Sequence, residues 1–296
     1  MSRLIRWRWA VAALVLGALI WQSMRLSSTE WRLPDRLSAW PLALATALAT
    51  FSYVAMATAW ARLRGRGEGW IDVGGPWFAS LIARYAPGGI WQGAVRVSHH
   101  SMRGRGITDA LIRFLSEQAL ACFSTSVVAL LLSIALPSPL WLIASLAAVA
   151  ATALVSSIVL ARRGLPTGWA PAAIGWTLAA HVAMAAAVAF LVVSWRPLDI
   201  TVFLLIARAF LVAGLAGLLV PLVPAGLGVR EMVLTWLLTP TFSVGQALAI
   251  ALASRAGLLC CELFVGGVWA TAYRLRGRKA IEPGDVASKY EKLRNK

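Results

Sequence analysis

The sequence predicts an all-α fold: a polytopic integral membrane helical bundle of about eight transmembrane helices, with one or two broken or re-entrant segments. Apolar residues make up 59% of the chain and charged residues 14%, whereas soluble domains average about 45–50% and about 25%. The mean hydropathy is +0.74. Long apolar runs recur along the chain, and most of them approach or exceed the roughly 20 residues that cross a bilayer as a helix.

The expected helices follow these runs. In chain order the runs are 9–24, 37–60, 110–136, 140–161, 171–195, 200–220, 226–238 and 244–273. The run 226–238 is short and begins with charge. We count it as a bent crossing helix, because two termini on one side require an even number of crossings. The alternative is a re-entrant loop there, with one other run failing to cross.

The segment 70–91, between the second and third runs, needs a separate interpretation. It is apolar, but it is short and interrupted by Gly and Pro. Irregular backbone is tolerated at membrane depth only inside protein or against water. We therefore expect the segment to lie on the cytoplasmic face or to enter the membrane as a re-entrant hairpin.

Arginine and lysine set the expected orientation, because short connections rich in them stay in the cytoplasm. They are concentrated in the N-terminus, the connection after the second run and the tail, and all four lysines lie in the tail. We therefore place both termini in the cytoplasm. Residues 1–273 are the predicted transmembrane domain, and 274–296 are a basic cytoplasmic tail. The run 9–24 lacks a convincing small-residue cleavage site, so we interpret it as a retained helix.

The net charge of +16 does not indicate nucleic-acid binding, because the aromatic residues lie in apolar runs and not on a basic face. The sequence has no nucleotide-binding loop and no nucleophile-elbow motif, so neither an ATP-driven pump nor a hydrolase is expected. His99 and His100 have no Cys or carboxylate at metal spacing. We predict no enzyme activity, no catalytic residue, no metal and no cofactor.

A first unusual motif, R-Y-A-P-G-G-I-W-Q-G, occupies 84–93. Pro87 ends any preceding helix, and Gly88 and Gly89 allow tight turns whose free amides attract anions. Arg84 supplies a bidentate partner for phosphate. At this depth the obvious anion is a lipid phosphate. The alternative is a plain interfacial turn with the arginine extending to water.

A second motif, P-A-G-L-G-V-R-E, occupies 224–231 and repeats this chemistry. Gly226 and Gly228 follow a helix break, and Glu231 is placed favourably near a helix N-terminus. Adjacent Arg230 and Glu231 cannot share one helix face, so each needs its own partner. Arg208 and Arg255 are candidates to reach Glu231. The alternative is a salt bridge that only locks helices.

Further charges lie inside the apolar runs. Glu117 either pairs with Arg113, four residues before it, or faces the interior and meets Arg84, Arg96 or Arg255. Arg208, Arg255 and Glu262 each cost at least about 2.5–3.5 kcal/mol to insert, so each requires a partner or a watery cavity. His181 is interpreted as a hydrogen-bonded packing residue.

The two motifs resemble the signatures of the flippase-like membrane domain, which is shared by the transmembrane region of lysylphosphatidylglycerol synthases and by stand-alone bacterial and archaeal relatives. The resemblance extends from about the second helix to the last. Glu117 and Arg255 fall where that family tends to place a Glu and an Arg. Gly89 stands where many relatives have Lys. Only a short basic tail follows the membrane part, so lipid aminoacylation is not expected.

The resemblance implies a lipid flippase-like protein of the bacterial inner membrane that binds an anionic or polyprenyl-linked lipid. The implied phosphate ligands are Arg84, Arg96, Arg230 and Arg255, with the backbone near Gly88, Gly89, Gly226 and Gly228. Glu117 and Glu231 would hold the arginines or compete with the phosphate for them. One alternative is a membrane scaffold that presents a lipid to a partner glycosyltransferase or lipid-modifying synthase. Another is a solute carrier.

Overall fold

The computed structural model describes residues 37–64, 70–84, 91–101, 106–136, 144–153, 170–219 and 226–279. In these ranges all regular structure is helical, which confirms the predicted class. The helices are α2 (Ala39–Arg64), α3 (Trp70–Ala83), α4 (Trp91–Ser101), α5 (Ile107–Ile134), an unlabelled short helix (Ala144–Ala153), α7 (Ala170–Val193), α8 (Ile200–Leu219), α9 (Val229–Leu238) and α10 (Val244–Lys279).

Among the described residues five helices are long and apolar enough to cross a membrane, so the chain is a multi-pass membrane protein. They are Ala39–Leu63, Ile107–Ile134, Pro171–Val193, Ile200–Leu218 and Val244–Ala272. Large apolar side chains point outward from them, and Phe264 on α10 is 68% exposed. The predicted run 9–24 lies outside the described residues, and only 144–153 of the run 140–161 lies within them. The count of about eight crossings therefore stays a prediction.

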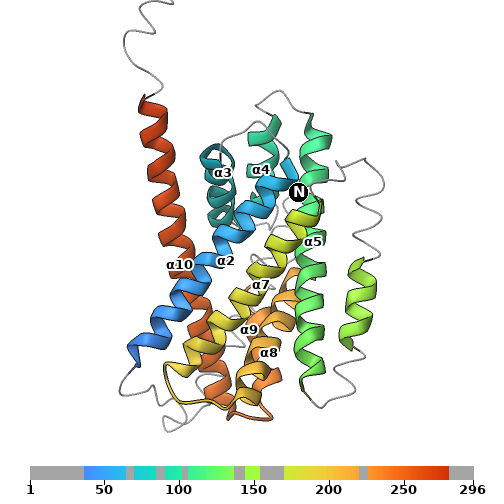
Figure 1. Ribbon diagram of the computed structural model, residues 1–296, viewed down its shortest axis with the longest axis vertical. Helices are drawn as coiled ribbons and strands as arrows, with labels where there is room; N and C mark the ends of the chain where they lie inside the picture. Colours follow the sequence, from blue (N-terminus) through green and yellow to red (C-terminus); the bar gives the residue numbers. More distant parts are fainter. Residues whose placement is uncertain are drawn as a thin grey trace, which may run out of the picture.

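Helices α2 and α7 form the most extensive helix contact and run side by side along much of their length (Figure 1). Small side chains line this contact, including Ala49 and Ala57 of α2 and Ala185 and Ala189 of α7, all of them buried. Small residues let helix backbones approach each other in a membrane, where packing replaces the hydrophobic effect between helices.

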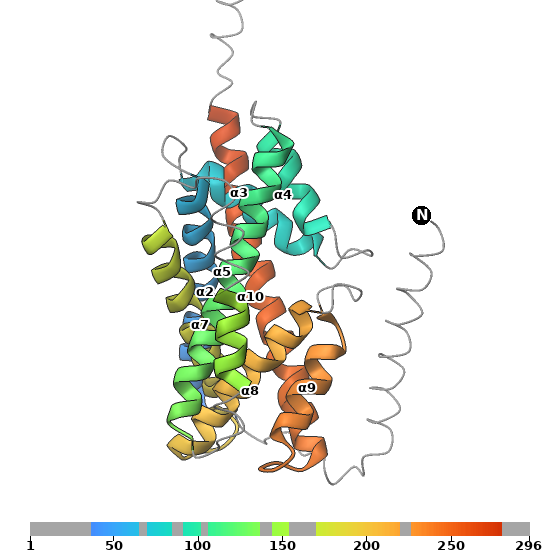
Figure 2. The same cartoon turned by 90° about the vertical axis from the view of Figure 1, so that its right-hand side faces the viewer.

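A first hairpin, α3 and α4, reaches into the bundle from one end (Figure 2). Its helix α3 runs antiparallel to α10: Gly74 lies against Trp269, Ile82 against Gly266, and Arg84 pairs with Glu262 near the middle of α10. With 14 and 11 residues, the two helices are about 21 and 16 Å long at about 1.5 Å per residue. Neither is long enough to span.

A second hairpin, α8 and α9, begins and ends at the opposite end of the bundle (Figure 2). Arg196, before α8, lies 4.6 Å from the ring centre of Phe242, after α9, so these two connections are neighbours. Helix α9 has 10 residues, or about 15 Å, half of the ~30 Å hydrocarbon core. The expectation that 226–238 forms a crossing helix by itself is not confirmed.

The tip of this second hairpin depends on glycine. Gly226 and Gly228 have φ of 64° and 84°, a region that residues with a Cβ avoid. A Cβ on Gly226 would lie 2.9 Å from the Cα of Gly217 in α8. The two backbones therefore touch, and this contact sets where α9 begins.

We predict that Gly226→Ala lowers the free energy of unfolding by about 2–6 kcal/mol, because it adds backbone strain of about 1–3 kcal/mol and overpacking of similar size. Thermal unfolding in detergent, followed by tryptophan fluorescence, measures this. The control is Gly267→Ala in α10, where an added Cβ meets nothing within 4 Å. Equal unfolding midpoints for the two variants would contradict the role given to Gly226.

Candidate functional site

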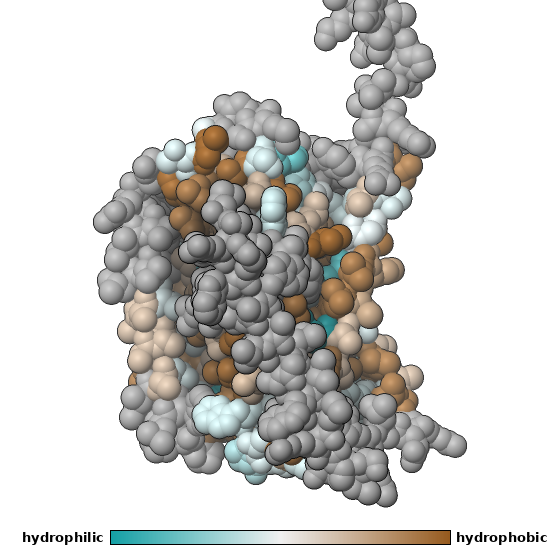
Figure 3. All heavy atoms as spheres, turned by 180° about the vertical axis from the view of Figure 1, so that it is seen from behind, coloured by the Kyte–Doolittle hydropathy of each residue, from teal (hydrophilic) through white to brown (hydrophobic). Residues whose placement is uncertain are grey.

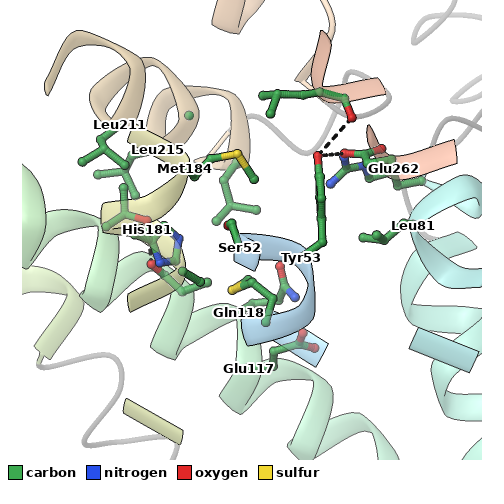
Figure 4. A pocket seen from close by; sticks show the side chains of 18 of the residues that line it. Ser52, Tyr53, Leu81, Glu117, Gln118, His181, Met184, Leu211, Leu215 and Glu262 are labelled. Carbon is green, nitrogen blue, oxygen red and sulfur yellow. Dashed lines mark hydrogen bonds and ion pairs between the residues drawn. The ribbon is translucent and has the colours of Figure 1, made fainter. Parts of the chain in front are cut away.

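The two hairpins and the surrounding helices enclose a cavity of about 230 Å³ (Figure 4). All four predicted arginine ligands line it, one from each motif and two from outside the motifs. They are Arg84, Arg96, Arg230 and Arg255. Two glutamates, Glu117 and Glu262, line it as well. Charge thus gathers inside a bundle whose coloured outer surface, on the right-hand side of Figure 3, consists mostly of apolar atoms with a few hydrophilic ones among them.

Arg84 is held by α10. Its guanidinium forms an ion pair with Glu262, whose side chain is 3% exposed. Tyr53 of α2 donates its hydroxyl to the same carboxylate at 2.6 Å, and Figure 4 shows this bond beside a longer one to the carbonyl of Leu258. Arg84 itself is 26% exposed, so it can meet a ligand without leaving the site.

Arg96 is enclosed. It forms an ion pair with Glu117, and its Nε donates to the Ser80 hydroxyl at 2.7 Å. The indole of Trp77 donates to the same Glu117 carboxylate at 2.8 Å. Aromatic rings of Trp60, Trp77 and Phe114 surround the guanidinium at 5.2–5.6 Å. Through these contacts Arg96, on α4, joins α3 and α5. Its side chain is only 1% exposed, so it is the least accessible of the four arginines.

Arg255 pairs with the second motif. Its Nε lies 3.8 Å from Glu231, so the partner is Arg255 rather than the other candidate, Arg208. The other oxygen of Glu231 accepts the amide hydrogen of Gly228 at 2.6 Å. This bond caps the N-terminus of α9. The Gly228 amide, predicted to help bind phosphate, is therefore occupied by Glu231 in this structure.

Arg230 differs from the other three arginines. Its guanidinium lies over the ring of Phe210, 4.3 Å from the ring centre. Within the described ranges no carboxylate pairs with it and no hydrogen bond of its side chain is recorded. A cation over an aromatic face gains about 0.5–2 kcal/mol, less than a buried carboxylate partner provides. Its hydrogen-bond donors remain available to the cavity.

The site carries excess positive charge. The four lining arginines are opposed by Glu117, Glu262 and the neighbouring Glu231, which leaves a formal charge of +1. Burial, and then the nearby Arg84 guanidinium, lowers the pKa of Arg96 to about 9. Burial, and then Arg255, lowers the pKa of Arg230 to about 10. Both values stay above 7, so both side chains remain cationic at neutral pH.

Several sequence predictions are resolved here. Glu117 faces the interior and meets Arg96, as one interpretation had it. The alternative pairing with Arg113 is wrong, because Arg113 donates to Asp109 at 2.8 Å. Gly88 and Gly89 lie outside the described residues, so their part in a phosphate site stays a prediction.

The sequence reasoning missed part of the lining. Glu262 stood out as a charge inside an apolar run, yet it was not assigned to the site. Tyr53, Gln118 and His181 also line the cavity. Each of these residues is a polar residue in an otherwise apolar helix, which was the available signal for a place in the lining. The sequence alone does not show which face of such a helix points toward the cavity.

In the part of the chain that the structure describes, no three His, Cys, Asp or Glu side chains lie close enough to hold a metal ion. Comparisons with protein families, curated proteins and solved structures found no match for this chain. The proposals below therefore depend on the geometry of the site and on the sequence motifs.

We predict that Glu117→Ala destabilises the protein by about 3–5 kcal/mol, because it leaves the buried Arg96 cation without its counter-charge. Asp109→Ala is the control: it removes an ion pair on the same helix, but Asp109 is 45% exposed. Such exposed pairs contribute about 0–1 kcal/mol. Unfolding midpoints of the two variants check this, and similar losses would show that the Arg96 pair has no special role.

Proposed function

We propose that this protein is a lipid flippase-like protein that binds the phosphate of an anionic or polyprenyl-linked lipid in the cavity and moves it across the inner membrane. Arg230 carries the proposal. It is a cation deep in an apolar bundle, over a phenyl ring and without a carboxylate partner among the described residues. A buried cation is costly unless something compensates it, and a phosphate would do so.

The charge of the site favours a phosphodiester. A phosphodiester carries one negative charge, and the site has a formal charge of +1. Guanidinium groups bind phosphate through paired, charge-assisted hydrogen bonds. Arg230 offers its donors directly, and Arg84 and Arg255 line the same cavity.

The ion pairs suggest how a charged headgroup enters. Arg84 and Arg255 are 26% and 14% exposed, whereas their partners Glu262 and Glu231 are buried. An arriving phosphate would exchange for a carboxylate at these arginines, so neither charge is stripped of partners in one step. Glu262 would keep its hydrogen bond from Tyr53, and Glu231 its bond from Gly228.

The hairpins suggest a route. Helix α3 ends beside the middle of α10, and α9 begins in the middle of the bundle (Figure 2). A headgroup bound there lies between two short hairpins that enter from opposite ends. A shift of one hairpin at a time would open the headgroup site to one side of the membrane at a time.

The same hairpins bear on topology. The predicted eight crossings count α8 and α9 as two, and a re-entrant hairpin counts them as none. Both counts are even, so both keep the two termini on one side, which we assign to the cytoplasm from the arginine-rich connections.

We predict that Arg230→Ala reduces lipid movement in proteoliposomes at least about 10-fold, because hydrogen bonds to a charged group contribute about 1.5–3 kcal/mol. The assay follows fluorescent phosphatidylglycerol in vesicles. Folding should be intact, since no glutamate loses its partner. The control is Arg196→Ala, which removes another arginine over a phenylalanine ring, at 4.6 Å, outside the cavity. Equal movement by both variants would refute the Arg230 site. Binding without any movement in the wild type would favour the scaffold.

Arg84→Ala is expected to lower both stability and lipid movement, because it leaves Glu262 buried and unpaired by that arginine. The double variant Arg84→Ala with Glu262→Gln should regain stability, since the amide still accepts from Tyr53, but it should not regain movement. Thermal unfolding and the proteoliposome assay separate the two effects. Full recovery of movement by the double variant would show that Arg84 is only structural.

A further inference from the structure

We infer that the cavity contains a second subsite for an uncharged, hydroxyl-bearing headgroup, so that the lipid is a phosphodiester of a small polyol or single sugar. This rests on the proposed function and names its substrate class. The subsite is formed by polar, uncharged side chains from α2, α5 and α7. They are Ser52, Gln118, Thr125 and His181.

The His181 end of this wall of uncharged side chains lies apart from the ion pair of Arg84 and Glu262. Figure 4 shows His181 on one side of Ser52 and Tyr53, and Glu262 on the other. Gln118 and Thr125 are seven residues apart on α5, two helical turns, so both face the cavity. A headgroup whose phosphate meets the arginines would therefore extend its far end toward α5 and α7.

The wall has unused hydrogen-bonding capacity. The side chain of Gln118 makes no recorded hydrogen bond with any described residue, although its amide has two donors and an acceptor. His181 Nδ1 lies 2.7 Å from the carbonyl oxygen of Thr177. A carbonyl only accepts, so Nδ1 donates, and in the neutral ring Nε2 is left as an acceptor.

This mixture of donors and acceptors matches hydroxyl groups, each of which both donates and accepts. It does not match an ammonium headgroup, which needs a free carboxylate or an aromatic cage. The cavity carboxylates Glu117 and Glu262 are already paired with arginines, and the net positive charge opposes a second cation. A bare phosphate monoester would leave Gln118 and His181 without partners.

The volume limits the size of the headgroup. The cavity has a volume of about 230 Å³, well above the roughly 10–15 Å³ that a single water requires. A phosphate with a glycerol or one sugar ring is of this order, whereas an oligosaccharide is much larger. The acyl chains would remain outside, along the apolar surface of the bundle.

The test uses the full chain in nanodiscs of equal phosphatidylglycerol, phosphatidylethanolamine and phosphatidic acid, with retained lipid measured by native mass spectrometry. We expect the wild type to retain phosphatidylglycerol at least about fivefold over each of the others. Gln118→Leu and His181→Phe should reduce this preference below about twofold while phosphatidic acid binding stays unchanged. Gln246→Leu, at an exposed position outside the cavity, should keep the full preference.

The outcomes separate the two proposals. Equal retention of phosphatidylglycerol and phosphatidic acid by the wild type, or a preference for phosphatidylethanolamine, overturns the hydroxyl subsite and leaves the phosphate site standing. Retention of no phosphate lipid overturns the proposed function itself. Displacement of lipid by equimolar glycerol 3-phosphate would assign the site to a soluble ligand. The lipid preference of the wild type tests the inference even if a variant fails to fold. If His181→Phe does not fold, His181→Gln is the milder substitution to use.

Discussion

The structure depends on the compensation of arginine inside an apolar bundle. Away from water, a guanidinium needs a negative partner, and removal of that partner costs several kcal/mol. Three of the four cavity arginines have one: Arg84 has Glu262, Arg96 has Glu117, and Arg255 has Glu231. These pairs join helices that are distant in the sequence. The fourth, Arg230, lies over the phenyl ring of Phe210 instead, and for this reason Arg230 carries the proposed phosphate site.

Helix length explains why the charges lie where they do. A helix that spans the membrane passes its polar backbone through the hydrocarbon fully bonded. The short helices α3 and α9 end or begin inside the bundle and bring helix termini to its middle. There Glu231 accepts the amide hydrogen of Gly228, the residue just before α9, and the end of α3 places Arg84 beside Glu262. The two motifs thus provide polar groups at a depth that no continuous span would supply.

Much of this was predictable from the sequence, and the rest had physical reasons to be hidden. Hydropathy predicted an all-helical membrane bundle. The two glycine-rich motifs singled out Arg84 and Arg230, which both line the cavity. A charge in an apolar helix requires a partner, so the isolated arginines Arg208 and Arg255 were the two candidates for Glu231, and the structure shows Arg255. Glu262 escaped assignment, since its partner lies on a distant helix and helix rotation is set by packing. Arg113 was one of the partners offered to Glu117, but Asp109 lies at the same four-residue spacing on its other side.

Helix α10 has a mechanical consequence. Arg255 and Glu262 are seven residues apart on it, two turns of one face, about 10 Å along the axis. The first is tied to α9 and the second to the end of α3. A tilt or rotation of α10 therefore changes the geometry of both ion pairs together. A ligand that breaks one pair then alters the stability of the other. By thermodynamic reciprocity, a change at the pair of Arg255 with Glu231 would then be felt at the pair of Glu262 with Arg84 through α10.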